Sequence, residues 1–396
     1  LFFDSNLSEP RTLACASCHD PRRGFTGNNN TLIGVAQGSR SDQFGTRDAP
    51  TLMYLATAPR FGSLESHGKR VPAGGHFWDG RADTLEEQAK QPFFNPVEMN
   101  NADMPALIAK VAKAAYADEF RQAWGAAIFN DAEAALDAMA ASIAAFVRTR
   151  VFQPFTSKFD HVMRGQAKFT AQEQRGLSLF ILPQKGNCAH CHSVDAASRD
   201  PQKSLFTDFS FRALGLPRSS RIPKNSDPAF FDLGLCERVP VAGVKLPVTA
   251  AKPPVTDPAT CGLFKTPTLR NITITAPYMH NGFFDNLRDA VAFYATRDTD
   301  PARWFPEGKK FDDLPARYHA NVDVDTPPYQ RRAQQRPQLT DGEIDDIVEF
   351  LYTLTDGYKP EGDRSGSRPQ AEITPPRPPI PSPSQPASSP PSRGEY

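Results

Sequence analysis

Apolar residues recur at helical spacing in two alanine-rich stretches of the first half of the chain, residues 105–124 and 131–151. The second stretch begins with Asp131, a favourable N-cap, and has Glu133 in its first turn. The apolar stripes consist of Leu107, Ile108, Val111, Ala115 and Phe120, and of Leu136, Met139, Ile143, Phe146 and Val147. Stripes of this period predict two amphipathic helices.

Two later helices are predicted from capping boxes, in which a Glu follows a Thr by three residues. One capping box is formed by Thr170 and Glu173. The other is formed by Thr340 and Glu343, at the start of an amphipathic segment over residues 339–354. The remaining pattern contains few convincing strands, so the predicted fold class is mainly α.

Between and after these helices the composition favours loops. Residues 204–267 are rich in Pro and Phe and predict a long irregular insertion. Eleven of the last 38 residues are Pro, mixed with Ser, which predicts a disordered or polyproline tail over 359–396. The chain is expected to cross between two domains around residues 152–165, which gives domains over 1–155 and 156–358.

The size and charge of the chain limit the classes of protein to which it can belong. With 396 residues it is long enough for two domains with separate cores. Lys plus Arg and Asp plus Glu both number 45, so there is no bulk basic field to attract nucleic acid or an anionic membrane. No apolar run approaches the roughly 18 residues of a transmembrane helix. We expect no nucleic-acid partner and no membrane span.

The chemistry of the chain is concentrated in two copies of a Cys-x-x-Cys-His motif. Two thiols at this spacing form thioethers with the vinyl groups of one haem, and the following His ligates the iron. A bare Cys-x-x-Cys also suits a zinc or redox site. Because a His follows the second Cys in both copies, the motifs predict a two-haem c-type cytochrome. The copies are Cys15-Ala-Ser-Cys18-His19 and Cys188-Ala-His-Cys191-His192.

Cys236 and Cys261 are the two cysteines outside these motifs. Covalent haem attachment predicts export to the oxidising periplasm, with a leader that this numbering does not include. In that compartment the two thiols are expected to form a disulfide that closes a Pro-rich loop. Two free thiols are the alternative, because a disulfide requires a geometry that a sequence does not reveal.

The segment over residues 77–99 contains Trp78, Gln88, Pro92 and Glu98, and the second half contains Arg270-Asn and Pro277-Tyr-Met-His-Asn-Gly282. With these residues and the two haem motifs, the chain resembles the bacterial dihaem cytochrome c peroxidase and MauG family. The resemblance covers about residues 1–356. It implies two cytochrome c-like helical domains with long irregular loops, an N-terminal peroxidatic haem domain and a C-terminal electron-transfer haem domain.

The resemblance implies that His19 ligates the peroxidatic haem, whose open face is lined by Gln88, Pro92 and Glu98. Glu98 is the expected acid and base, since cleavage of peroxide requires a proton to leave one oxygen and reach the other. Glu98 lies among apolar residues, where a raised pKa suits that role. Pro92 keeps the distal face free of a ligand, and Trp78 lies between the haems and couples them.

The resemblance also implies a calcium ion between the haems, a hard cation that takes oxygen ligands. The matching positions are Asp48, Thr275 and Pro277, the last two through backbone carbonyls. The family usually has Asn where this chain has Asp48, and either side chain offers an oxygen.

The distal ligand of the second haem departs from the usual family pattern. Classical members have a Met fourteen residues after the His that corresponds to His280, whereas this chain has Tyr294, opposite His192. A phenolate-type donor stabilises higher oxidation states of iron. Tyr294 is therefore the expected second ligand, and a Tyr at this position resembles the MauG-like branch of the family. The alternative is that Tyr294 is an aromatic side chain packed in the core.

The peroxidatic haem shows a second departure. Classical members place a resting-state His ligand where this chain has Arg40, and no His occurs between His19 and His67. We therefore expect the first iron to be five-coordinate or water-bound. His67 and His76 are possible substitutes, and His76, two residues before Trp78, is the better candidate.

Together these features indicate a periplasmic enzyme that reacts with hydrogen peroxide and forms high-valent haem iron. It either takes electrons from a small cytochrome c or cupredoxin, or oxidises a residue of a partner protein, and a homodimer is possible. The expected cofactors are two covalently bound haem c groups and one calcium ion. The alternative is a dihaem electron-transfer cytochrome without peroxide chemistry, in which the match of Gln88, Pro92 and Glu98 is accidental.

Overall fold

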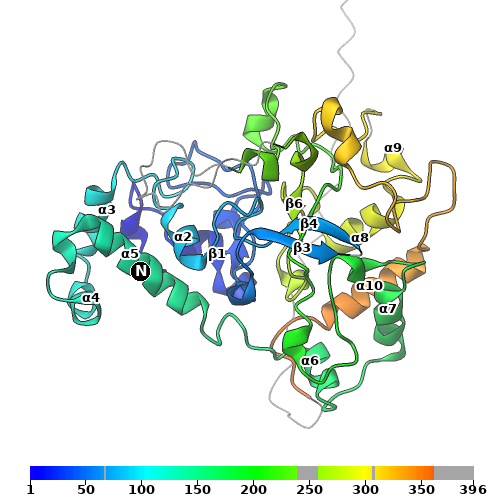
Figure 1. Cartoon of the computed structure of the whole chain (residues 1–396), viewed down its shortest axis with the longest axis horizontal. Coiled ribbons are helices and arrows are strands. Elements are labelled where there is room, and N and C mark those ends of the chain that lie inside the picture. The colour runs from blue at the N-terminus through cyan, green and yellow to red at the C-terminus, as the bar shows by residue number, and fades with distance from the viewer. Residues whose placement is uncertain (67, 239–256, 306–307, 361–396) are drawn as a thin grey trace, which may run out of the picture.

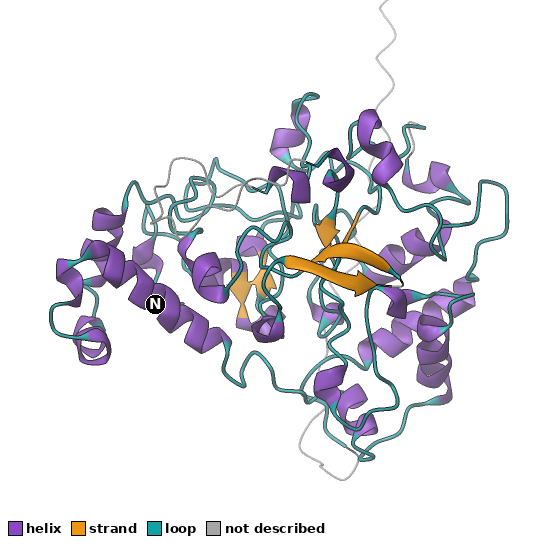
Figure 2. Ribbon diagram, in the orientation of Figure 1, coloured by secondary structure: helices purple, strands orange, loops and turns teal. Residues whose placement is uncertain are grey.

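The computed structural model describes residues 1–66, 68–238, 257–305 and 308–360. Helices dominate the regular structure and are joined by long loops and short 3-10 turns (Figures 1 and 2), which confirms a largely helical fold in this coarse sense. None of the described helices has both the length and the apolar character needed to cross a bilayer. The helices are α1 Cys15–Cys18, α2 Leu85–Lys90, α3 Met104–Val111, α4 Ala117–Trp124, α5 Ala132–Val147, α6 Lys158–Met163, α7 Ala171–Ile181, α8 Leu287–Thr296, α9 Pro301–Trp304 and α10 Asp341–Tyr352.

Strands are few in the described residues and form three separate antiparallel pairs. The longest pair, the β3–β4 hairpin, was not predicted, because half of its positions are exposed and its sequence offers no apolar alternation. Figure 1 shows this hairpin reaching toward the other half of the molecule, where Ala73 pairs with Ser210. The pairs are β1 His19–Asp20 with β2 Thr26–Gly27, β3 Gly62–Ser66 with β4 Lys69–Ala73, and β5 Phe211–Arg212 with β6 Phe264–Lys265.

Two predicted segments extend outside the described residues. The predicted insertion is largely irregular where it is described, with the two-residue strands β5 and β6 and short 3-10 turns, and its residues 239–256 lie outside the description. Residues 361–396 of the predicted tail also lie outside it.

The stretch over residues 105–124 was predicted as one helix, and this was wrong, because it forms two helices. Val111 and Phe120 would lie on opposite sides of a straight helix, at about 100° per residue. Both side chains are nevertheless buried in the same hydrophobic cluster. The break after Val111 allows this, and the Tyr116 hydroxyl fixes the turn by donating to the Asp4 carboxylate at 2.6 Å.

Both predicted capping boxes are present. The side chains of Thr170 and Thr340 accept hydrogen bonds from the backbone N–H of the third residue of α7 and α10, respectively. The carboxylate of the Glu at that position accepts a hydrogen bond from the backbone N–H of the Thr. The two helices pack closely, since a Cβ at Gly176 would lie 2.0 Å from the Asp346 carbonyl oxygen. Because only Gly permits this approach, α7 delivers the chain to the second Cys-x-x-Cys-His motif at a fixed distance from α10.

The buried apolar side chains follow the two halves of the sequence. Two clusters draw their buried residues from the chain up to Phe152, and a third from Phe159 onward. Figure 1 shows the same separation, with α2 to α5 on one side and α6 to α10 on the other. The domain limits at residues 155 and 358 stay predictions.

The two halves meet through a turn of the C-terminal half. Gly282 in this turn has a φ of +56°, and a Cβ on it would lie 2.0 Å from the Gly34 carbonyl oxygen. The backbone N–H of Asp48 donates to the His280 carbonyl at 2.7 Å. Backbone contacts therefore fix the position of the side chains that this turn carries.

Arg270, part of the segment that resembles the family, is fully buried and holds several elements together. Its guanidinium donates to both carboxylate oxygens of Asp160 on α6, at 2.9 and 3.1 Å. It also donates to the carbonyl oxygens of Ser204 and Pro201, at 2.9 and 3.0 Å. Arg270 and Asp160 form a salt bridge without any exposed side-chain surface.

Replacing Arg270 by Met is expected to lower the free energy of unfolding by about 3–5 kcal/mol, because the Asp160 carboxylate stays buried without its cation. Arg288→Met is the matched control, since the Arg288–Asp345 pair is exposed and is worth less than about 1 kcal/mol. Urea unfolding followed by far-UV circular dichroism compares the two. Equal unfolding midpoints would contradict the role assigned to Arg270.

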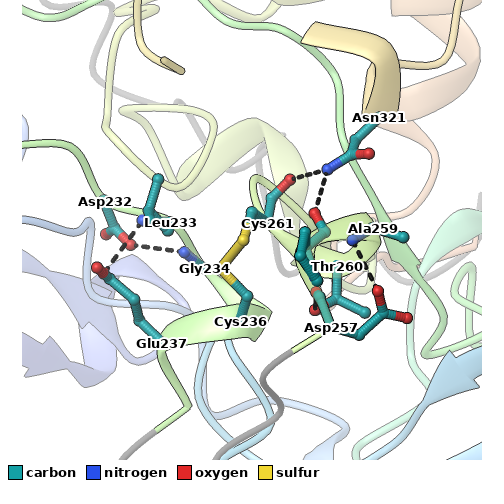
Figure 3. Close-up of a disulfide and its surroundings, with 11 residues drawn as sticks. Asp232, Leu233, Gly234, Cys236, Glu237, Asp257, Ala259, Thr260, Cys261 and Asn321 are labelled. Carbon is teal, nitrogen blue, oxygen red and sulfur yellow. Dashed lines mark hydrogen bonds between the residues drawn. A yellow bond between two sulfur atoms is a disulfide. The ribbon is translucent and has the colours of Figure 1, made fainter. Parts of the chain in front are cut away.

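Cys236 and Cys261 form a disulfide, which confirms the predicted pairing over two free thiols. Figure 3 shows the local hydrogen bonds of the two joined segments. The Gly234 N–H donates to the Asp232 carboxylate at 3.0 Å, and the Asn321 amide donates to the Cys261 carbonyl at 3.0 Å. The disulfide thereby fixes the loop that carries Asp232.

Replacing Cys236 and Cys261 by Ser is expected to lower the free energy of unfolding by about 3 kcal/mol, the loop-closure entropy expected for this length. The bridge spans a sequence separation of 25 residues. Thermal unfolding with and without a reducing agent measures the effect. Reduction should lower the midpoint of the natural protein to that of the double variant, and a natural protein insensitive to reduction would disprove the expectation.

Candidate functional site

Each Cys-x-x-Cys-His motif lines its own cavity. The first motif, on α1 and the residue after it, lies on the wall of the first cavity. The second motif begins in the 3-10 turn Cys188–His190, which follows α7, and lies on the wall of the second cavity. The structure therefore presents two separate sites with the same set of motif residues.

The two motif histidines are held in the same way. His19 Nδ1 lies 2.9 Å from the Phe25 carbonyl oxygen, and His192 Nδ1 lies 3.0 Å from that of Phe206. Desolvation lowers the pKa of both imidazoles, which favours their neutral form. A neutral ring that donates from Nδ1 keeps the lone pair of Nε2 for a metal. Both side chains fit axial ligation of haem iron.

The motif cysteines do not resemble a zinc or dithiol redox site. Desolvation raises the pKa of Cys15 to about 11 and those of Cys18 and Cys188 to about 12. Zinc ligands and redox nucleophiles are thiolates, which such surroundings disfavour. Within the described ranges, no three or more His, Cys, Asp and Glu side chains are grouped to hold a metal ion. The surroundings fit thioether attachment of haem better.

The turns beside the two cavities share one backbone design. His76 pairs with Ala82 across the first turn, and Tyr278 pairs with Phe284 across the second. In each turn the next residue has a positive φ. Each turn leads through an N-cap into a helix, α2 in the first case and α8 in the second. The two sites are therefore built on a repeated supersecondary unit.

The same offset in sequence relates further residues of the two units. Trp78 corresponds to His280, and Pro92 corresponds to Tyr294. A Pro cannot continue a helix and restricts the residue before it, so α2 ends at Lys90. Helix α8 continues and carries Tyr294 into the second cavity. The first cavity thus has a ring without a ligand atom where the second has a phenol.

The structure brings the predicted peroxidatic residues together. Gln88, Pro92 and Glu98 all line the first cavity, with His19. Gln88 lies on α2, and Glu98 lies in a turn where its backbone N–H donates to the Asn95 carbonyl at 2.9 Å. Desolvation raises the pKa of the Glu98 carboxyl above its usual range. The cavity therefore contains a carboxyl suited to both accept and return a proton.

Arg81 and Asn95 also line this cavity, and the sequence did not single them out. The positive charge of Arg81 and the side chain of Asn95 act against the desolvation of Glu98 and limit the rise of its pKa. Arg81 is held by the Gln91 side chain and the Asp79 carboxylate, both at 2.9 Å. Their place within the segment that resembles the family was the available signal.

Arg40, where classical members of the family have a His, does not line the cavity. Its side chain is half exposed and pairs with Asp42 at 3.4 Å. The neighbouring Ser39 N–H donates to the Glu98 carbonyl at 2.8 Å, so this loop covers the distal segment. Arg40 offers no ligand to the first iron.

His76 lines the first cavity and is 3% exposed. Its Nδ1 has no hydrogen-bond partner in the part of the chain that is described. Desolvation lowers the pKa of His76 to about 3, so the imidazole is neutral. His76 stays the better of the two possible substitutes, and His67 lies outside the described residues.

Three residues, Asp48, Pro50 and Trp78, line both cavities. The indole N–H of Trp78 donates to the Asp48 carbonyl at 2.8 Å. The ring centroids of Trp78 and His280 are 6.5 Å apart. The indole is therefore fixed in the wall between the cavities, where the resemblance expects it, and its electronic role stays a proposal.

A buried ionic network joins this wall to the loop fixed by the disulfide. Arg47 donates to Asp79 at 2.6 Å and to Asp232 at 2.6 and 2.7 Å. Burial alone would raise the pKa of Asp79, but Arg81 and Arg47 lower it to about 2. The network is therefore ionised and ties the residue after Trp78 to the C-terminal half.

The predicted calcium positions all belong to the second cavity. Asp48, Thr275 and Pro277 all line it. The Asp48 carboxylate accepts a hydrogen bond from the Asn28 amide at 2.6 Å, and desolvation raises its pKa well above the usual range. A buried carboxylate beside backbone oxygens fits a hard cation, so these donors suit calcium.

Tyr294 lies in the second cavity together with His192. Its ring stacks on Tyr329, with centroids 5.9 Å apart and an interplanar angle of 28°. Desolvation raises the pKa of the Tyr294 phenol. The sequence did not point to Tyr329, because the residues around it match no motif.

The fold and the two haem-motif cavities define a dihaem c-type protein, and comparison with known proteins gives its family. Residues 1–168 match the family of di-haem cytochrome c peroxidases. The chain is 38% identical to the methylamine utilization protein MauG of Paracoccus denitrificans over 369 residues, which cover 91% of this chain and 88% of that protein. The chain therefore belongs to the dihaem cytochrome c peroxidase family, a family of oxidoreductases with two haem c groups.

Solved structures agree with this assignment. The diheme peroxidase BthA from Burkholderia thailandensis matches with a TM-score of 0.81 and 43% identity, over 90% of this chain and 84% of that chain. A MauG-like protein associated with microbial copper homeostasis matches with a TM-score of 0.58 and 26% identity, over 90% of this chain and 87% of that chain. The arrangement of elements described above is thus the dihaem peroxidase fold.

Proposed function

We propose that this chain is a periplasmic, MauG-like dihaem enzyme that reacts with hydrogen peroxide at the first cavity and shares the two oxidising equivalents with the second. The observation that carries the proposal is that Pro92 in the first unit and Tyr294 in the second occupy equivalent positions. One site has a distal face without a ligand and with an acidic side chain, and the other has a phenol at the equivalent position.

In the first cavity, Glu98 is the group that moves protons. Its carboxylate would take the proton from one peroxide oxygen and return it to the other, so that the O–O bond breaks and the second oxygen leaves as water. Gln88 orients the peroxide through its amide, and Pro92 keeps the site open. When bound, haem iron supplies the redox chemistry and holds the oxidising equivalents at high valence.

The second cavity stores the second oxidising equivalent. Tyr294 and His192 would hold the iron of a haem bound there, and an oxygen donor of this kind would favour a higher oxidation state than Met does. Trp78, in the wall shared by the cavities, is the proposed electronic connection between them. The ionic contacts of Arg47 hold the backbone beside that indole.

The equivalents are passed to a donor outside the chain. A small cytochrome c or cupredoxin would make the protein a peroxide scavenger, and a protein side chain as reductant would make it a modifying enzyme. Tyr294 and the Arg at position 40, where classical members have a His ligand, favour a MauG-like site, and both outcomes are compatible with such a site. A homodimer stays a prediction.

We further propose a calcium ion near Asp48, Thr275 and Pro277. A cation there would neutralise the Asp48 carboxylate, which has no ion-pair partner within the described part of the chain. Its expected role is to hold the wall between the cavities, since the Asp48 carbonyl also accepts the Trp78 indole.

The test is the addition of one equivalent of hydrogen peroxide to the resting diferric protein, followed by electron paramagnetic resonance and near-infrared absorption. Loss of both ferric signals with a new, long-lived near-infrared band is expected. A short-lived product that turns over only with an added reductant would instead favour a peroxide scavenger.

A dihaem electron-transfer cytochrome is the second candidate. It predicts two six-coordinate, low-spin irons and no reaction with peroxide. The open distal face at Pro92 and the enclosed carboxyl of Glu98 argue against it, because electron transfer needs neither.

A further inference from the structure

The ring of Tyr329 contacts both the Tyr294 ring and the Arg297 guanidinium beside the second cavity. Tyr294 stacks on Tyr329 with ring centroids 5.9 Å apart, and both residues line the cavity. The guanidinium carbon of Arg297 lies 4.1 Å from the centroid of the Tyr329 ring. Tyr294 lies in the last turn of α8, and Arg297 is the C-cap residue of that helix. The Tyr329 ring therefore contacts two side chains at the same end of α8.

Arg297, whose guanidinium contacts the Tyr329 ring, is held rigidly. Its side chain is fully buried and donates to the Leu214 and Asp323 carbonyl oxygens, both at 2.6 Å. Asp298 balances its charge, and Lys310 also pairs with Asp298. A cation with this many fixed contacts keeps one orientation, and its face provides a firm base for an aromatic ring.

Tyr329 is also held by contacts of its own backbone segment. It is 5% exposed, and its backbone N–H donates to the Thr326 carbonyl at 2.7 Å. Two residues earlier, the Pro327 carbonyl accepts from the Asn187 amide at 3.1 Å. Asn187 directly precedes Cys188, so the Tyr329 segment is fastened to the second haem motif itself.

By contrast, the Tyr294 hydroxyl makes no hydrogen bond within the described part of the chain. The orientation of the phenol therefore depends on packing of its ring. A side chain that must present one oxygen atom to a metal loses that ability when the ring is free to rotate, because ligands act only when their rotamers are fixed by surrounding residues.

We propose that Tyr329, anchored by Arg297, is a positioning residue that holds the Tyr294 phenol in the geometry needed to ligate the second iron. The inference rests on the proposed function, in which Tyr294 is that ligand. It assigns to Tyr329 a role in the lifetime and spectrum of the oxidised protein without any contact with peroxide.

The test compares Tyr329→Leu, which removes the ring, with Tyr329→Phe, which keeps it. Low-spin ferric resonance of the second haem and its midpoint potential are measured in the diferric holoprotein, with haem content and circular dichroism as checks of folding. Tyr329→Leu should broaden and shift the low-spin signal, move the potential and shorten the life of the near-infrared band. Tyr329→Phe should match the natural protein.

Two further variants make the outcomes distinguishable. Tyr294→Met shows whether the phenol is a ligand at all: if its low-spin signal equals that of the natural protein, the proposed function fails. If Tyr294→Met shifts the signal and Tyr329→Leu does not, the positioning role is wrong. If Tyr329→Leu does not fold, Arg297→Gln, which leaves Asp298 paired with Lys310, should produce the same shift by releasing the Tyr329 ring; an unshifted signal there overturns the proposal.

Discussion

Replacing Glu98 by Gln is expected to slow the reaction with hydrogen peroxide by about 10²–10⁴-fold, the usual contribution of a positioned acid or base. Gln keeps the size and polarity of the side chain but cannot accept and return a proton. Stopped-flow absorption of the haem bands at varied peroxide concentration measures the rate constant. The variant should bind both haems normally, since covalent attachment uses the cysteines of the motifs and not the Glu98 carboxyl.

The pH dependence of the same reaction tests the role of Glu98 more directly. The carboxylate must be deprotonated to act as a base, so the rate falls as the pH decreases through the pKa of Glu98. Because desolvation raises this pKa, the fall should occur at a higher pH than for an ordinary Glu side chain. In Glu98→Gln this step in the pH profile should be absent.

Glu119→Gln is the control for both measurements, since Glu119 is exposed on α4 and does not line the cavity. Its rate and pH profile should equal those of the natural protein. An unchanged rate in Glu98→Gln would show that another group transfers the proton, and His76 would be the next to examine because it faces the same cavity.

The helices that could be predicted from the sequence are those with local signals. The capping boxes at Thr170 and Thr340 depend on side chains and backbone three residues apart, and both are present. The division of residues 105–124 into α3 and α4 could not be predicted, because it depends on the burial of Phe120 in a core formed by distant residues. The β3–β4 hairpin likewise depends on a contact with Ser210 across the molecule.

The candidate site divides along the same line. Gln88, Pro92 and Glu98 were expected on the resemblance, and the structure brings them to one cavity with His19. Their supporting residues were not expected, because the charge of Arg81 and the side-chain hydrogen bond of Asn95 reach Glu98 only in the folded chain. The role of Tyr329 was the hardest to predict, since its contact with Tyr294 joins α8 to a loop whose sequence shows no recognisable pattern.

The two cavities differ at one pair of equivalent positions, where the first has Pro92 and the second has Tyr294. Because the supporting turns are alike and α8 extends through Tyr294, a substitution of this residue alters the ligand of the second site without altering its scaffold. A thioether sulfur raises the potential of a haem, whereas a phenol oxygen stabilises the oxidised levels of iron. The ability to keep both equivalents of peroxide for a long time should therefore depend on Tyr294.

Tyr294→Met is accordingly expected to abolish the long-lived near-infrared band after one equivalent of peroxide, while the covalent haem content stays at two. The first cavity is untouched, so the initial rate with peroxide should be retained, in contrast to Glu98→Gln. Potentiometric titration should show a higher potential for the second haem. Tyr352→Phe, an exposed tyrosine at the end of α10, is the control and should leave all of these properties unchanged. Survival of the long-lived band in Tyr294→Met would mean that the phenol is a packing residue of the cavity and that the second equivalent resides elsewhere, with the Trp78 indole in the shared wall as the nearest candidate.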